Sequence, residues 1–514
     1  MFVPIYPVTR DTNGVKSTST VGAGYEGWRA TNPLFSVQGT SGSATWLASS
    51  TTNQKLNVDL GRAEACSRIR IENWHHFGAI TDRGIRNFTV YGTNEATAFN
   101  NTTYADTNDL TELGVYEARE HSADSLSEPE YFYFENETAY RYYILRIADN
   151  WGHGLQLGVR RVEFQKDIST GHAPIYLLRN DGAHVKATTT RPGDEAANVV
   201  NRVKYTIGGI QTEGWQSNVG SASEQKINFD LSEPKIIKKL YLENYHSTGN
   251  PDDRGIRNFT VYGTNEATAF NNTTYADTND LTELGVFEAS AHIAADNNDP
   301  QIFDLTNDTA YRYYILRIAD NYGDASRMGC RRIYLLDEHT PHYPPIVDPT
   351  TITATTNSAT AYQGARRFSE TTIEWESTAA TNQKFIVDYG DGNAFAATRL
   401  MLENSHNATF AKGINSFAIY GSNSAPSTDY ATDAGLVQLA SGLNAVASTT
   451  TNEHETQYFD FSNTTEYRYY VLKVASNLGD GSTMNIAQAE FHGAGGAGPT
   501  PGADSDAIFF GCNF

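Results

Sequence analysis

The sequence predicts an all-β protein made of three tandem jelly-roll β-sandwich domains and a short C-terminal tail. Its 514 residues suffice for about three domains of ordinary size. Short segments alternate polar with apolar residues at period two, separated by clusters of Gly, Asn, Asp and Thr. No segment shows a sustained helical period. A long stretch also repeats, which indicates that one fold is used more than once.

The repeat defines the length of one unit. Asp82–Val115 recurs without a change as Asp253–Val286, 171 residues further on. A later segment, Ala139–Asn150, recurs at the same shift. A third, more divergent copy of both segments lies at Gly413–Asn423 and Glu466–Asn477. The unit is therefore a whole domain of about 160 to 170 residues, and not a short solenoid repeat.

Similar openings mark where each unit begins. Pro4, Pro174 and Pro345 are each followed by Ile and then by Tyr or Val. We expect sandwiches at residues 1–167, 168–338 and 339–493, then a Gly/Pro-rich spacer and an apolar tail at 494–514. The apolar end, Ala507–Phe514, cannot bury itself alone, so it either docks on this chain or a neighbour or frays.

Four segments of the first unit carry the strand pattern most clearly: Lys55–Leu60, Arg68–Ile71, Phe88–Tyr91 and Arg141–Ile147. Each is rich in β-branched or aromatic residues. Because side chains alternate across a strand, we expect Ile69 and Ile71 to face the core and Arg68 and Arg70 the solvent. Strands of this kind with no helices between them favour an antiparallel sandwich.

Composition excludes several partners. Lys plus Arg number 38 and Asp plus Glu number 60, which gives a formal net charge of −22. A chain this acidic lacks the basic face that sequence-independent binding to nucleic acid or anionic lipid needs. No stretch has the length and apolarity of a membrane span, and the N-terminus has no signal-peptide pattern. We therefore expect no membrane insertion. If Met1 is the natural start, secretion by a cleaved signal is not supported, and a chain that begins after a removed signal would look the same.

The cysteines, Cys66, Cys330 and Cys512, are odd in number and scattered one to a region. They therefore give no disulfide framework. Cys66 and Cys330 lie beside strand-like segments and are expected to be packed, reduced thiols. Cys512, near the C-terminus, is the thiol best placed to meet another chain.

The three units share a series of residues in the same order. A Trp and a polar run precede a Gln and an Asp on a strand, then Phe and Tyr-Gly on another, and finally Tyr-Tyr before Leu on a third. The series is Trp46, Gln54, Asp59, Gly61, Phe88, Tyr91, Gly92, Tyr142, Leu145 and Arg160–Phe164 in the first unit; Trp215, Gln225, Asp230, Phe259, Tyr262, Tyr313 and Leu316 in the second; and Trp375, Gln383, Asp388, Phe417, Tyr420, Tyr469 and Leu472 in the third. This pattern resembles the discoidin, or coagulation factor V/VIII type C, domain, one of the galactose-binding-domain-like jelly rolls. The resemblance spans nearly all of the chain apart from the tail.

The resemblance implies an eight-stranded, non-catalytic sandwich whose loops at one end bind ligands, commonly sugars and sometimes lipid head groups or protein. It also implies that many relatives hold a structural calcium through a loop before the Trp and a Glu near the last strand. Here the loop Asn32–Gly39 has no Asp-Gly, and the late Glu is present as Glu163 and Glu490 but replaced by Tyr334 in the second unit. Calcium takes about six to eight oxygens, and carbonyl ligands are invisible in a sequence. Structural calcium therefore stays open, and no other cofactor is expected.

Two loops are the candidate ligand-binding sites. The first carries a Glu-Asn-x-His core ahead of a basic residue in all three units, and the second begins with an aromatic residue in the first two. Amide, imidazole and guanidinium groups read sugar hydroxyls, and an aromatic face stacks on the sugar ring. The candidate residues are Asn73, Trp74, His75, Arg83, Trp151 and His153; Asn244, Tyr245, His246, Arg254 and Tyr322; and Asn404, His406 and Lys412.

Other interpretations of these residues stay open. Asn73 and His75 can brace their own loop through backbone hydrogen bonds, and Asp82 can pair with a nearby arginine on the surface. The adjacent His75 and His76 have no third ligand at helical or hairpin spacing, so zinc is not predicted. No nucleophile-elbow, zinc-protease, Walker or Rossmann pattern occurs in a fitting context, so no enzyme is predicted.

The sequence is therefore interpreted as a non-catalytic glycan-binding attachment protein whose repeated shallow sites act together through avidity. The expected partners are cell-surface or extracellular glycans, and the expected setting is a virion surface, as a fibre, spike or decoration protein, or the extracellular space. The chain is expected to form a homo-oligomer or to assemble with other virion proteins. One alternative is a structural scaffold that assembles chains or particles without binding sugar. Another is the binding part of a larger enzyme whose catalytic chain is separate.

Overall fold

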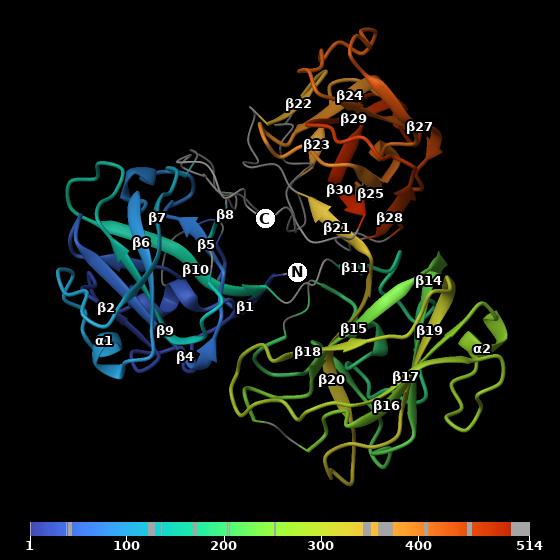
Figure 1. The fold of residues 1–514 in the computed structure, drawn as a ribbon, viewed down its shortest axis with the longest axis horizontal. Helices are drawn as coiled ribbons and strands as arrows, with labels where there is room; N and C mark the ends of the chain where they lie inside the picture. Colours follow the sequence, from blue (N-terminus) through green and yellow to red (C-terminus); the bar gives the residue numbers. More distant parts are fainter. Residues whose placement is uncertain are drawn as a thin grey trace. The chain divides into compact units, whose positions relative to one another are not determined.

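The computed structural model describes residues 2–37, 39, 44–121, 129–134, 136–167, 172–202, 204, 206–250, 253–342, 351–357, 374–405, 410–449 and 455–494. Each third of the chain forms its own pair of five-stranded sheets, whose strands pair antiparallel (Figure 1). The predicted all-β fold of tandem jelly-roll sandwiches is confirmed. The first sandwich is one compact unit of the chain, and the second and third belong to another.

Two sheets make up the first sandwich. The first sheet runs in the order β1 (Phe2–Ile5), β10 (Leu157–Asp167), β5 (Arg68–Asn73) and β8 (Pro129–Tyr133), with β3 (Trp46–Ala48) also pairing with β10. The second runs β2 (Val15–Ser17), β4 (Gln54–Glu64), β9 (Tyr140–Ile147), β6 (Asn87–Thr93) and β7 (Thr111–Glu117). Short helices lie in the connections: η1 (Gly27–Thr31), η3 (Thr81–Arg83) and α1 (Ala96–Asn100).

The second sandwich repeats this topology. Its first sheet is β11 (Ala173–Ile175), β20 (Gly329–Asp337), β15 (Ile237–Asn244) and β18 (Pro300–Asp304), with β13 (Trp215–Gln216) on β20. Its second sheet is β12 (Val185–Ala187), β14 (Gln225–Lys235), β19 (Tyr311–Ile318), β16 (Asn258–Thr264) and β17 (Thr282–Glu288), and its helices are η4 (Ala196–Val199) and α2 (Ala267–Asn271). The register is also repeated, since Phe88 pairs with Ile147 and Phe259 with Ile318.

The third sandwich keeps the same order with shorter connections. Its first sheet is β21 (His339–His342), β30 (Asn485–Ala494), β25 (Ala397–Asn404) and β28 (Thr456–Asp460), with β23 (Trp375–Glu376) on β30. Its second sheet is β22 (Ile352–Ala354), β24 (Thr381–Asp388), β29 (Tyr469–Ser476), β26 (Ser416–Ser422) and β27 (Val437–Asn444), and η6 covers Phe410–Lys412.

A tryptophan anchors each core where the sheets face one another. Trp46, Trp215 and Trp375 are fully buried. Each indole N–H donates to a backbone carbonyl, as from Trp46 to Ser19 at 3.0 Å, so the ring is buried without an unmet donor. Among the described residues no helix is long and apolar enough to span a membrane.

The thiol prediction is confirmed for two cysteines. Cys66 and Cys330 are free and fully buried, and burial raises the pKa of each thiol. Cys512 and the apolar tail Ala507–Phe514 lie outside the described residues.

The alternation along β5 is as predicted on one face only. Ile69 and Ile71 are buried in the core. Arg68 was expected in solvent but is buried, because its guanidinium packs over Tyr131 at 4.6 Å and donates to Gln165. The outer face of this sheet is therefore covered by long side chains of its own strands.

Candidate ligand-binding site

The two candidate loops lie at the same end of each sandwich. In the first, β5 ends at Asn73, opposite Val159 of β10, and the bridge between Gly84 and Gly158 joins the end of one loop to the end of the other. Equivalent bridges join Gly255 to Gly329 and Gly413 to Asn485. We call this end of each sandwich the rim.

An asparagine at the end of β5 ties three segments of the rim together. Asn73 Nδ2 donates to the carbonyls of Ile85 at 2.8 Å and Arg119 at 2.7 Å. Asn244 and Asn404 make the same pair of bonds in their own sandwiches, and all three are buried. All three asparagines therefore bond to the backbone of their own rim, and their contact with a ligand stays a prediction.

Glycine is needed beside this amide. A Cβ on Gly84 would lie 2.7 Å from the Asn73 side chain, and one on Gly413 would lie 2.8 Å from Asn404. Real Cβ contacts are longer, so only glycine lets the basic loop close onto the brace. The Asn and the Gly after the basic residue thus act together to hold the basic loop against the end of the strand.

The histidine of the Glu-Asn-x-His core is also a brace. His75 is fully buried; its Nε2 lies 2.9 Å from the Val37 carbonyl, and its Nδ1 accepts from the Gly78 N–H. Burial, with His121 and Arg160 nearby, lowers the pKa of His75 to about 4, so the ring is neutral. His246 is buried in the same way. Contact of these two histidines with a ligand stays a prediction, and His406 lies outside the described residues.

Two residues of this network were missed by the sequence analysis. His121 stacks on His75 with 4.0 Å between ring centroids, and Arg160 Nη1 donates to the carbonyls of His75 and Gly39. Both stand far from His75 in the chain, where no local pattern reveals them. One signal could have linked them. The second copy keeps both residues, as His292 and Arg331, and the third copy replaces both, by Ser448 and Ala487.

The group Glu72, His75 and His121 has metal-like spacing, with ligand atoms within 4.8 Å of one another. A divalent ion needs lone pairs that are available. Both ring nitrogens of His75 already bond to the backbone, and Arg160 Nη1 lies 3.1 Å from Nε2 and 3.4 Å from Nδ1. The guanidinium of Arg160 therefore already places a positive charge beside His75. The group acts as a buried polar network and not as a metal site.

In the first sandwich the residues implied for structural calcium do not fit that ion. Glu163 accepts from Arg70 at 3.2 Å and from Arg161 at 2.9 Å. Burial raises the pKa of Glu163, but these two guanidinium groups outweigh it and hold the pKa below its usual range. Arg161 also donates to the Phe35 carbonyl in the early loop. One guanidinium thus joins the loop to the carboxylate, as a calcium ion would.

Aromatic residues support the rim from below. Trp74 and Tyr245 are buried, and stacking of their faces on a ligand stays a prediction. Each ring lies beneath the basic residue of its loop, with Arg83 5.6 Å from the Trp74 ring and Arg254 5.5 Å from the Tyr245 ring. A cation over an aromatic ring is favourable, so these rings help to fix the guanidinium groups.

The remaining candidates keep accessible surface. Arg83, His153, Trp151, Arg254, Tyr322 and Lys412 are half-buried. Arg86 lies over the Trp151 ring at 4.6 Å and Arg257 over the Tyr322 ring at 5.8 Å.

The rim cation has a defined partner set in each sandwich. Arg83 Nε lies 3.2 Å from His153 Nε2. Arg254 pairs with Asp324 at 3.2 Å and donates to Gln216 and Tyr245. In the third sandwich Lys412 pairs with Glu376 at 2.6 Å, and Thr483 also donates to this carboxylate. The cation recurs although its partners change.

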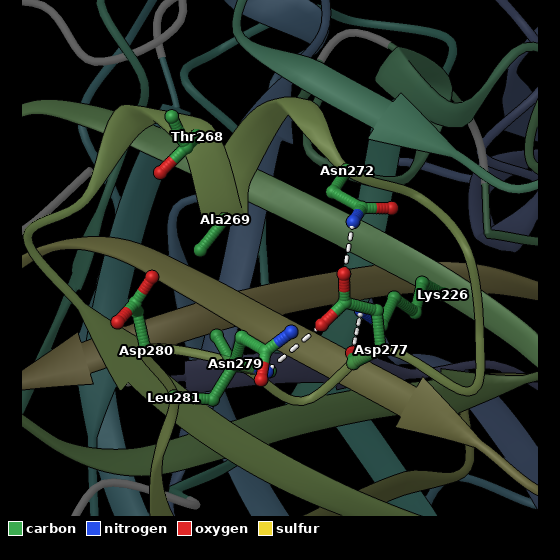
Figure 2. Close-up of a pocket in the computed structure, with 8 residues that line it drawn as sticks. All are labelled: Lys226, Thr268, Ala269, Asn272, Asp277, Asn279, Asp280 and Leu281. Carbon is green, nitrogen blue, oxygen red and sulfur yellow. Dashed lines mark hydrogen bonds between the residues drawn. The ribbon is translucent and has the colours of Figure 1, made fainter.

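A separate hollow of about 200 Å³ lies outside the rim loops, beside α2 (Figure 2). It is lined by Lys226, Thr268, Ala269, Asn272, Asp277, Asn279, Asp280 and Leu281. Its polar groups largely bind one another: Lys226 donates to the Asp277 carbonyl, and Asn272 and the backbone of Asn279 donate to the Asp277 carboxylate. These bonds stabilise the loop before β17 and leave few groups for a ligand.

No family model matches the sequence, and no curated protein matches it. Solved structures similar to the chain include a fucolectin from striped bass (Morone saxatilis) serum, with a TM-score of 0.23 and 12% identity over 63% of this chain and 95% of that one. Allantoicase from Saccharomyces cerevisiae gives 0.28 and 12% over 65% and 93%. A carbohydrate-binding module from Clostridium perfringens, in complex with GalNAc-β-1,3-galactose, gives 0.22 and 10% over 29% and 91%. Similarity this low settles no function.

Proposed function

We propose that the rims of the sandwiches bind carbohydrate without catalysing a reaction. One observation carries the proposal: a half-buried cation recurs at the same rim position in all three sandwiches, on a loop that a buried Asn braces. Sugar sites combine a few fixed polar groups with an aromatic surface, and a braced loop keeps such groups in place before the ligand arrives. Arg83, Arg254 and Lys412 are the proposed ligand-contacting cations.

The second loop would complete each site. His153 and Asp324 lie within hydrogen-bond distance of the rim cation, and Trp151 and Tyr322 add partly exposed rings. In the third sandwich Leu478 takes the aromatic position, so ring stacking from this loop is proposed for the first two only.

The rim carboxylates support a non-catalytic role. A glycosidase needs two carboxyl groups facing each other across the bond to be cleaved. Asp324 is held by two backbone N–H groups and by Arg254, while Glu376 is held by Lys412 and Thr483. Carboxylates held in this way serve to order the loops.

Weak single sites are expected to act together. Linking similar sites on one chain raises the apparent affinity for a multivalent surface through effective concentration. Extracellular or cell-surface glycans are therefore the proposed partners.

The test uses the full chain on a glycan array. We expect a set of bound glycans whose signal falls on Arg83→Ala, Arg254→Ala or Lys412→Ala, and falls furthest in the triple variant. Lys166→Ala is the matched control, because it removes a half-exposed cation at the opposite end of β10 and should leave binding unchanged. Loss of binding in the control, or equal binding by the triple variant, would contradict the proposed site.

The virion-surface setting and the homo-oligomer stay predictions, as does the scaffold alternative. Co-purification of the protein with particles tests the first. Concentration-dependent assembly that is lost on deleting Ala507–Phe514, with no signal on the array, would favour the scaffold.

A further inference from the structure

The rim of the first sandwich differs from the other two in its supply of acceptors. Position 153 and its counterparts lie in the same backbone setting: the N–H groups of His153, Asp324 and Asp480 donate to the carbonyls of Asp82, Asp253 and Ala411. The side chain at this position is an imidazole in the first sandwich and a carboxylate in the other two.

In the second sandwich one carboxylate does two things. Asp324 Oδ1 accepts from the N–H groups of Ser326 at 2.6 Å and Arg327 at 2.7 Å, which closes the loop. Its Oδ2 accepts a hydrogen bond from Arg254 Nε at 3.2 Å. The charge of the rim cation is thus neutralised within the sandwich.

The third sandwich reaches the same balance by another route. Asp480 Oδ1 accepts from the N–H groups of Ser482 at 2.8 Å and Thr483 at 3.0 Å. Lys412 pairs at 2.6 Å with Glu376, whose carboxylate stands where the first sandwich has Leu47.

The first sandwich cannot do the same with His153. Its Nδ1 faces the N–H groups of Leu155 at 3.3 Å and Gln156 at 3.1 Å, while its Nε2 faces Arg83 Nε at 3.2 Å. A neutral imidazole has one accepting nitrogen. Whichever nitrogen carries the proton, one side of the ring sets a donor against a donor.

Two further donors at this rim find no acceptor among the described residues. They are the Nε1 atoms of Trp74 and Trp151, and both atoms are buried. A buried donor without an acceptor is destabilising. Arg83 makes no ion pair within the described part of the chain, and its burial lowers the pKa of the guanidinium despite the nearby Asp82 and Tyr25. The rim therefore carries a surplus of positive and N–H groups.

Resting on the proposed function, we propose that the rim of the first sandwich selects a carbohydrate bearing an anionic group, a carboxylate or a sulfate, that supplies the missing acceptor beside Arg83 and His153. The rims of the second and third sandwiches already hold their own carboxylates and select neutral sugars. One chain thus presents two ligand classes.

The overall charge of the chain indicates where the affinity for an anionic sugar must arise. At −22 the chain repels anions at long range, so an anionic sugar gains little from steering. Its binding must come from contacts at the rim itself. A single change of charge at position 153 should then strongly change the affinity for an anionic sugar, because the acidic chain offers no broad basic surface to compensate.

The experiment uses the full chain with galactose, galactose 6-sulfate and galacturonate as matched probes, by titration calorimetry. His153→Asp gives the first sandwich the carboxylate of the second, and Asp324→His does the reverse. We expect His153→Asp to weaken binding of both charged probes about tenfold or more and to leave galactose unchanged. Asp324→His should raise the number of charged-probe sites from one to two.

Two further measurements separate the explanations. His153→Asn keeps a neutral acceptor, so it should retain charged-probe binding where His153→Asp loses it; this distinguishes charge from loop damage, with melting temperature as the folding check. Competition by inorganic sulfate as strong as that by galactose 6-sulfate would overturn sugar selection. If galactose binds but neither swap changes the preference, the inference is wrong while the proposed function stands. If no sugar binds any variant on the array or by titration, both fail.

Discussion

Replacing Asn73 by alanine tests whether the rim is built on a buried brace. The change removes the donor to the carbonyls of Ile85 and Arg119 and the acceptor of the backbone N–H of Trp74. Because these groups are buried, each loss costs about 1 kcal/mol or more, so we expect a total near 3 kcal/mol. For a domain of this size that lowers the melting temperature by roughly 6–12 °C.

Differential scanning calorimetry of the full chain gives the measurement. The transition of the first sandwich should move, and those of the others should stay; Asn244→Ala is the internal replicate in the second sandwich. Asn100→Ala is the control, since among the described residues this exposed amide donates only to Ala96 within α1, and its loss should change the free energy of unfolding by less than about 0.5 kcal/mol.

The same variant distinguishes bracing from direct recognition. If Asn73 positions the rim, stability and sugar binding fall together, and raising the temperature toward the new transition worsens both. A variant that loses binding at unchanged melting temperature would refute the brace and restore Asn73 as a ligand contact. A variant that keeps both would refute the hydrogen-bond argument altogether.

Three further outcomes follow from buried groups. Calcium or a chelator should leave the melting temperature unchanged, whereas Arg161→Ala should destabilise the first sandwich by about 3–5 kcal/mol by leaving Glu163 underpaired, which calorimetry with and without chelator measures. The pKa of His75 is about 4 when folded and about 6.5 when unfolded, so the unfolded state binds more protons between these values. Stability should fall by about 3 kcal/mol as the pH drops through that window, and His75→Gln should show a smaller fall in urea titrations. Cys66 and Cys330 should resist alkylation in the folded chain and react on unfolding, as peptide mass spectrometry would show.

The strands were predictable because their signal is local. Alternation at period two placed Ile69 and Ile71 correctly in the core, and the exact repeat of Asp82–Val115 required a second sandwich like the first. The prediction was wrong for Arg68, because its burial depends on Tyr131 and Gln165 on neighbouring strands. Alternation along a strand predicts which face of the sheet a polar residue lies on. It does not predict whether side chains of neighbouring strands bury that face.

The rim could be located from the sequence but not resolved into roles. The Glu-Asn-x-His core marks the same rim loop in each unit, and the basic residue after it keeps accessible surface. Which side chains turn inward is decided by partners far along the chain, such as Arg119 for Asn73 and His121 for His75. From the motif alone, every polar residue in it looks available to a ligand. Buried polar groups, however, need hydrogen-bond partners within the protein.

The differences between the first two sandwiches are not spread evenly over the rim. The braces are the same residue type in both: Asn73 and Asn244, His75 and His246, His121 and His292, Arg160 and Arg331. The positions around the rim cation differ: Trp74 and Tyr245, Trp151 and Tyr322, His153 and Asp324, Leu47 and Gln216. If the rim only stabilised the fold, substitutions would be expected in braces and surroundings alike. Unchanged braces beside changed neighbours of the cation are what the proposed ligand site would need for retuning, because the supporting network sets geometry and the neighbours set charge and hydrogen bonding.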